Sequence, residues 1–182
     1  PTWPECVPGS YLPVEGQAEG ALHAWIEFGN RLLTFALFFA AVATLIAVVR
    51  SGRPDLRFLA ATQILGILAQ GVLGGITVLT NLNPLSVASH LLLSIILIAA
   101  ATSLHSRRHH PQVRTSSTQV RISRLSLAHI VVAFIAIAIG TLVMGSGPHA
   151  GDVDAPRLDF DISTITRLHS SSVWLLLIIT FI

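Results

Sequence analysis

Five long apolar runs constrain this chain more than any other feature of its sequence. They cover residues 25–49, 58–79, 85–104, 125–145 and 164–182. Each run is close to the ~20 residues that an α-helix needs to cross a hydrocarbon core of about 30 Å. Because 52% of the residues are hydrophobic and only 11% are charged, the composition also lies outside the range of soluble domains. The sequence predicts an all-α integral membrane protein, a transmembrane bundle with five spans.

The basic residues predict the orientation of this bundle. All 11 are arginines. Eight of them gather between the first and second runs (Arg50, Arg53, Arg57) and between the third and fourth (Arg107, Arg108, Arg114, Arg121, Arg124). Since arginine-rich loops stay in the cytoplasm, we expect a multi-pass protein of the cell (plasma) membrane whose N-terminal segment lies outside. The same rule explains the Arg- and His-rich loop, so no nucleic-acid partner is expected.

A faint internal repeat predicts two related halves. "QGVLGGITVLTNLNP" ends the second run and "AIAIGTLVMGSGPHAGD" ends the fourth, and each precedes a run with a histidine near its start. These histidines are His90 and His169. We therefore expect an N-terminal half at 1–104, a basic cytoplasmic linker at 105–124 and the start of a C-terminal half at 125–182.

Polar side chains share one depth in the predicted membrane. His90 and His169 should lie about 8–9 Å inside the outer ends of their helices, and Glu27 and Asn30 lie at a similar depth in the first. Ionisable groups inside a membrane are costly and usually face the bundle interior, where they serve a function. This layer is the predicted cofactor site.

Simpler roles for the same residues stay open at this point. Glu27 and Arg31 have the i,i+4 spacing of an ion pair that only stabilises one helix. Each histidine could donate a hydrogen bond to a neighbouring helix. Gln63 and Gln70 lie on one helix face and could form hydrogen bonds across the bundle.

Haem b is the cofactor that fits these residues best. Imidazole ligates haem iron, and inward histidines of a helix bundle are typical of b-type sites, so His90 and His169 are the expected metal ligands. Zinc would need three or four closely placed ligands, which scattered histidines and a single cysteine do not supply. That cysteine, Cys6, lies in the outer segment, where a disulfide is allowed.

Six motifs in this order carry a resemblance to a known family. They are "PTWPEC", "IEFGNR", "QGVLGGITVL", "SHLLL", "GSGPHAGD" and "ITRLHSSSVW". Over essentially its whole length the chain resembles the haem A synthase family, in the form found in actinobacteria and their relatives. Family members have eight spans in two four-helix halves, so the resemblance places this chain at about spans two to six.

The resemblance implies an enzyme that oxidises a methyl group of haem O to a formyl group, making haem A for haem–copper terminal oxidases. It implies haem b as cofactor, haem O as substrate, and haem O synthase and a terminal oxidase as partners, in a lipid membrane. Glu27 then matches the catalytic glutamate, and His90 and His169 match haem ligands. Asn30 departs from the family, which usually has a histidine there. An amide is a poor iron ligand, so His90 is expected to act alone or with another group.

The resemblance also bears on the two remaining residues. Arg31 is expected to contact a haem propionate, since a guanidinium suits a carboxylate. Cys6 is expected to pair with a cysteine just before Pro1. A membrane b-type cytochrome subunit that only transfers electrons is the alternative function.

Overall fold

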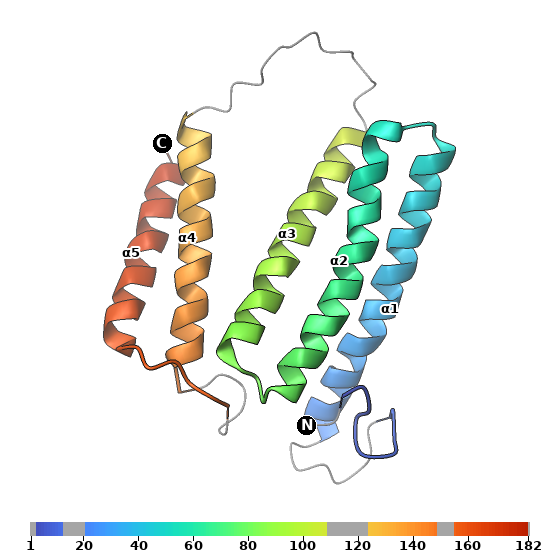
Figure 1. The fold of residues 1–182 in the computed structure, drawn as a ribbon. Coiled ribbons are helices and arrows are strands. Elements are labelled where there is room, and N and C mark those ends of the chain that lie inside the picture. The colour runs from blue at the N-terminus through green and yellow to red at the C-terminus, as the bar shows by residue number, and fades with distance from the viewer. Residues whose placement is uncertain (1–2, 13–20, 109–123, 149–154, 182) are drawn as a thin grey trace. The chain divides into compact units, whose positions relative to one another are not determined.

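The computed structural model describes residues 3–12, 21–108, 124–148 and 155–181. Its regular elements there are five helices (Figure 1): α1 (Ala21–Arg50), α2 (Pro54–Leu79), α3 (Pro84–Arg108), α4 (Arg124–Ser146) and α5 (Ile162–Thr180). All five are long and apolar enough to cross a membrane. The prediction of an all-α, multi-pass membrane protein is confirmed.

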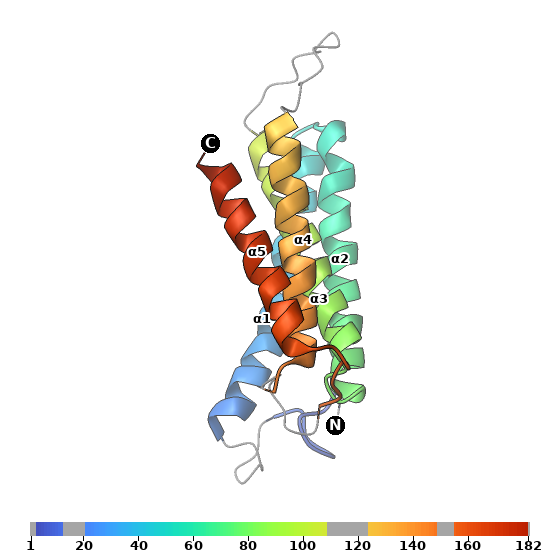
Figure 2. The ribbon, with the colours of Figure 1, turned by 90° about the vertical axis from the view of Figure 1, so that its left-hand side faces the viewer.

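The chain forms two compact units. The first comprises Pro1–Thr80 and Ser89–Pro111, and the second comprises Asn81–Ala88 and Gln112–Ile182. In the first unit, α2 packs against both α1 and α3. In the second, α4 and α5 run side by side in both ribbon views (Figures 1 and 2). The division into halves at 1–104 and 125–182 stays a prediction.

Proline and glycine set the turn between α1 and α2. Pro54 is the first residue of α2, where its missing N–H costs no helical hydrogen bond. Gly52 has a φ of +66°, a conformation that suits a residue without a Cβ. Arg53 donates to the Asp55 carboxylate from Nε (3.0 Å) and Nη2 (2.8 Å). This hydrogen bond raises the pKa of Arg53 above its ordinary value.

A polar cap decides where α5 begins. The Asp161 carboxylate accepts hydrogen bonds from the Thr164 hydroxyl (2.6 Å), the Thr164 backbone N–H (2.8 Å) and the Ser163 hydroxyl (2.9 Å). These bonds, that of the Thr164 hydroxyl foremost, lower the pKa of Asp161. The helix therefore starts at Ile162, two residues before the apolar run at 164.

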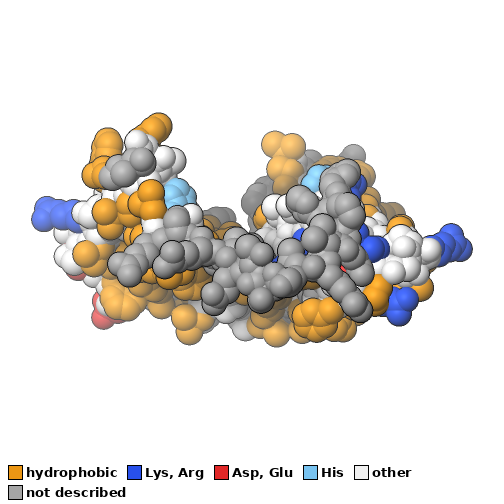
Figure 3. Space-filling model, turned by 90° about the horizontal axis from the view of Figure 1, so that it is seen from above, with side chains coloured by type: hydrophobic (Ala, Val, Ile, Leu, Met, Phe, Trp, Pro, Cys, Tyr) orange, Lys and Arg blue, Asp and Glu red, His pale blue; other side chains and the backbone are white. Residues whose placement is uncertain are grey.

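Few side chains of the described helices are buried, and many large apolar ones are exposed. A small core joins α1, α2 and α3 through Val48, Leu56, Ala60 and Leu104. Large apolar side chains cover the outward faces, seen in Figure 3 in a view onto the Arg50 end of α1. Such faces are costly in water and suited to lipid, which agrees with helices that span a membrane.

Several threonines in these helices, or directly after one, form hydrogen bonds to the backbone of the same helix. Their hydroxyls donate to the carbonyl four residues earlier at 2.7–3.2 Å, at Thr34, Thr44, Thr77, Thr80, Thr102 and Thr180. This bond is the usual alternative to water for a hydroxyl in a helix.

Candidate functional site

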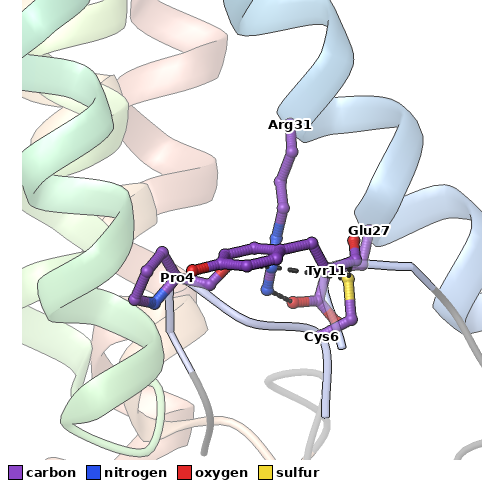
Figure 4. A network of polar contacts seen from close by, with 5 residues as sticks. All are labelled: Pro4, Cys6, Tyr11, Glu27 and Arg31. Carbon is purple, nitrogen blue, oxygen red and sulfur yellow. Dashed lines mark hydrogen bonds and ion pairs between the residues drawn. The ribbon is translucent and has the colours of Figure 1, made fainter. Parts of the chain in front are cut away.

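Glu27 and Arg31 meet near the start of α1, as their spacing predicts. Nη2 of Arg31 donates to Oε1 of Glu27 at 2.5 Å. Nη1 of the same guanidinium donates to the Pro4 carbonyl oxygen at 2.8 Å and approaches Sγ of Cys6 at 3.5 Å (Figure 4). The Arg31 side chain is 22% exposed and that of Glu27 is 42% exposed. The arginine is thus the less exposed partner, and it contacts both its own helix and residues 4–6.

Residues 3–12, called here the N-terminal segment, fold back on themselves beside this pair. The Cys6 thiol donates to the Tyr11 carbonyl at 3.2 Å (Figure 4). The Trp3 ring lies on Gly75 of α2, where a Cβ would come within 2.6–2.8 Å of three ring atoms. The segment is therefore in contact with α1 through Arg31 and with α2 through Gly75.

His90 of α3 lies over a glycine of the neighbouring helix. A Cβ on Gly74 of α2 would stand 3.5 Å from Cε1 of His90. Nδ1 of His90 is buried and has no hydrogen-bond partner among the described residues. Gln70 holds this part of α3 in register, because its Nε2 donates to the His90 carbonyl (3.0 Å) and to the Ser94 hydroxyl (2.6 Å). The predicted hydrogen bonding of Gln70 across helices is confirmed.

His169 of α5 repeats this arrangement in the second unit. A Cβ on Gly140 of α4 would stand 3.1 Å from Cε1 of His169. Nδ1 of His169 lies 3.1 Å from the Ala136 carbonyl oxygen. Because a carbonyl only accepts, Nδ1 must carry the hydrogen, and Nε2 of the neutral ring keeps its lone pair. This is the usual orientation of a metal-ligating imidazole.

The other sequence-predicted residues have less defined surroundings. Asn30 is exposed on α1, and its backbone carbonyl accepts a hydrogen bond from the Thr34 hydroxyl at 3.2 Å. Nε2 of Gln63 is buried and has no partner in the described part of the chain. The structure therefore brings Glu27, Arg31 and Cys6 together, while His90 and His169 each belong to their own unit.

These residues suit haem better than a bare metal ion. Across the described ranges, no group of three or more His, Cys, Asp or Glu side chains could hold a metal ion. A haem iron needs only one or two protein ligands, and a flat macrocycle needs helix surface without bulky side chains. An imidazole packed on a glycine supplies both, and this pairing occurs at His90 and at His169.

Sequence reasoning left open a hydrogen bond from each histidine to a neighbouring helix, and His169 makes one to α4, but the carbonyl groups that are used were not identified. The carbonyl groups of Ala136 and Pro4 fix His169 and Arg31, yet no residue type marks them in advance. The contact of Trp3 with Gly75 was missed as well. A signal for it existed, since a double glycine at 74–75 allows close approach from more than one side.

Comparisons with known proteins place most of the chain in one family. Residues 16–154, well over half of the chain, match the COX15-CtaA model, described as cytochrome oxidase assembly protein. No curated protein and no solved structure matches the chain. The matched range contains Glu27, Asn30, Arg31 and His90, whereas Cys6 and His169 lie outside it.

Proposed function

This chain belongs to the COX15-CtaA family of cytochrome oxidase assembly proteins, and we propose that its part in assembly is to oxidise haem O to haem A. The reaction converts a ring methyl group into a formyl group, with the oxygen supplied by water. Four electrons and four protons leave the methyl group and the water in the process, and the electrons pass to an external electron acceptor. A site for this chemistry needs a haem-binding surface, a proton acceptor and a route for electrons.

The observation that carries the proposal is the repeated packing of an imidazole on a glycine of the preceding helix. His90 on Gly74 and His169 on Gly140 give two equivalent places for a haem, one in each unit. We assign the resident haem b to His169, whose Nε2 is left free to ligate by the bond from Nδ1 to Ala136. The substrate haem O is assigned to His90.

Glu27 is the proposed catalytic residue. It accepts a proton from the water that attacks the oxidised methyl group, and a carboxylate that is partly removed from solvent is a suitable base. Arg31 keeps that carboxylate in one orientation and remains the candidate partner for a haem propionate. When bound, haem b supplies one-electron redox chemistry that carries the electrons away from the substrate.

The partners follow from the same proposal. Haem O arrives from a haem O synthase, and haem A leaves to a haem–copper terminal oxidase. The loop arginines orient the protein in the cell membrane with the N-terminal segment outside. Glu27 and the N-terminal segment then lie near the outer surface.

Haem extraction tests the proposal directly. The full-length protein is produced in a host that makes haem O but lacks its own haem A synthase, and the extracted haems are separated by chromatography. We expect haem A and its hydroxylated intermediate to accumulate with the protein and not with an empty vector. Bound haem b without any conversion of haem O would favour the electron-transferring cytochrome instead.

A further inference from the structure

We propose that Arg31 is a positioning residue that couples the N-terminal segment to Glu27. The contact of the Trp3 ring with Gly75 of α2 holds this segment in place. This inference rests on the proposed function for the role of Glu27. It assigns new roles to Trp3, Gly75 and Arg31. It also explains why the partly buried guanidinium of Arg31 contacts both the N-terminal segment and the Glu27 carboxylate.

The first step is the geometry of the guanidinium. One planar group donates to the Glu27 carboxylate and to the Pro4 carbonyl, and it also approaches the Cys6 sulfur (Figure 4). The fork of an arginine is rigid, so its donors keep fixed directions relative to one another. A displacement of the Pro4 carbonyl therefore turns the guanidinium and moves the carboxylate bound to its other nitrogen.

The second step is the attachment of the segment to α2. The Trp3 ring fills the space above Gly75 so closely that a Cβ would approach Cε2, Cδ2 and Cζ2 to 2.6, 2.7 and 2.8 Å. Gly75 is buried. Its neighbour Gly74 is the residue under His90. Two consecutive glycines of α2 thus contact the Trp3 ring of the N-terminal segment and His90, the proposed ligand of the substrate haem.

The third step is the link between the two attachments, because Trp3 and Pro4 are adjacent residues and the turn after them is closed by hydrogen bonds. The Cys6 N–H donates to the Ser10 carbonyl at 2.9 Å, and the Ser10 N–H donates to the Val7 carbonyl at 2.9 Å. The Gly9 N–H donates to the Glu5 carboxylate, also at 2.9 Å, and Gly9 has a φ of +83°. A displacement of Trp3 therefore reaches the Pro4 carbonyl and Arg31 directly along the chain, while the closed turn keeps Cys6 beside the same guanidinium.

The test uses the full-length protein and a pair of matched variants in α2. Gly75→Ala places a methyl group against the Trp3 ring, whereas Gly71→Ala, one turn earlier, meets nothing within 4 Å. Hydrogen–deuterium exchange over residues 3–12 measures the attachment without reference to activity. We expect exchange there to become about tenfold faster in Gly75→Ala, as for a segment that opens locally, and to stay unchanged in Gly71→Ala.

Kinetics test the coupling to Glu27. In Gly75→Ala and in Arg31→Lys, which keeps the charge but loses the fork, we expect kcat for haem O conversion to fall about ten- to a hundredfold. In Gly75→Ala, KM and haem content should stay at wild-type values, a split that a general loss of folding would not give. Gly71→Ala should convert haem O normally.

A double-mutant cycle guards against a variant that fails to fold. Trp3→Ala removes the ring instead of crowding it, so adding Gly75→Ala to Trp3→Ala should cause no further loss. Unchanged hydrogen–deuterium exchange over residues 3–12 in both Gly75→Ala and Trp3→Ala would overturn the proposed attachment of the N-terminal segment to Gly75. Faster exchange with a normal kcat would overturn the coupling through Arg31. A wild-type protein that converts no haem O would overturn the proposed function, while the exchange data would still decide the attachment.

Discussion

Nδ1 of His169 lies 3.1 Å from the carbonyl oxygen of Ala136 on the neighbouring helix. This hydrogen bond fixes the ring tautomer and the ring plane before any ligand arrives. His90 has a buried Nδ1 with no such partner among the described residues. The two histidines therefore differ in how firmly they are held, which fits a permanently bound haem at one and an exchangeable substrate at the other.

A methyl group added to the glycine beneath each imidazole should disturb haem binding more at Gly140 than at Gly74. A Cβ on Gly140 would lie 3.1 Å from Cε1 of His169, tighter than about nine in ten real Cβ contacts, whereas one on Gly74 would lie at an ordinary 3.5 Å from His90. Overpacking costs about 1–3 kcal/mol, equivalent to roughly five- to 150-fold in binding. Gly140→Ala should therefore lower the haem b content of purified full-length protein, while Gly74→Ala should leave the retention of haem O near wild type. Equal haem loss in both would contradict the geometry.

Replacing the proposed base should separate haem binding from chemistry. Glu27→Gln keeps the size of the side chain and an acceptor for Arg31 but removes the carboxylate. We expect a normal b-type spectrum together with loss of haem A, by at least the roughly hundredfold typical of a missing general base. Chromatography of extracted haems measures this. Wild-type yields of haem A would leave Glu27 with only its ion pair.

Removing each histidine should reveal two sites. In full-length protein, His169→Ala should abolish the resident b-type signal, whereas His90→Ala should mainly weaken retention of haem O. The losses should be roughly additive, because separate sites share no partners. If both single variants and the double variant lose one identical signal, both histidines serve one haem, as in the cytochrome alternative.

Acid should weaken the start of α5. The pKa of Asp161 is depressed by its hydrogen bonds from Thr164 and Ser163, so its stabilising effect is present above the ordinary pKa of an aspartate. That effect is lost as pH falls through the lower, folded-state value. We expect the thermal midpoint of the wild-type protein to drop below about pH 4 more steeply than that of Asp161→Asn. Parallel pH curves for the two proteins would exclude this cap as a source of the acid sensitivity.

The sequence predicts the helices well because lipid leaves the backbone few options. A run of about 20 apolar residues must satisfy its own N–H and C=O groups, so length alone indicates a helix. α1 and α2 begin four residues before the predicted runs, and α5 begins two residues before, because its first turn is held by the polar cap of Asp161 and not by apolar side chains. Hydropathy does not register such a cap.

Prediction of the candidate site depended on whether a contact is local. Glu27 and Arg31 are four residues apart on one helix, so their spacing predicts the pair. Arg31 and Pro4 are 27 residues apart, and His169 and Ala136 are 33 apart. In both, one partner is a backbone carbonyl, which every residue possesses. Only the folded chain shows which carbonyl is used.

The threonines that donate to their own helix have a consequence for how such a protein enters a bilayer. A hydroxyl that already donates to the carbonyl one turn earlier needs no hydrogen-bond partner from the lipid, and the side chain then presents mainly its methyl group. Transfer scales that assign one value to each residue type overstate the insertion cost of Thr44, Thr102 and Thr180. We expect each to be exchanged for valine with little change in the fraction of molecules that the translocon inserts.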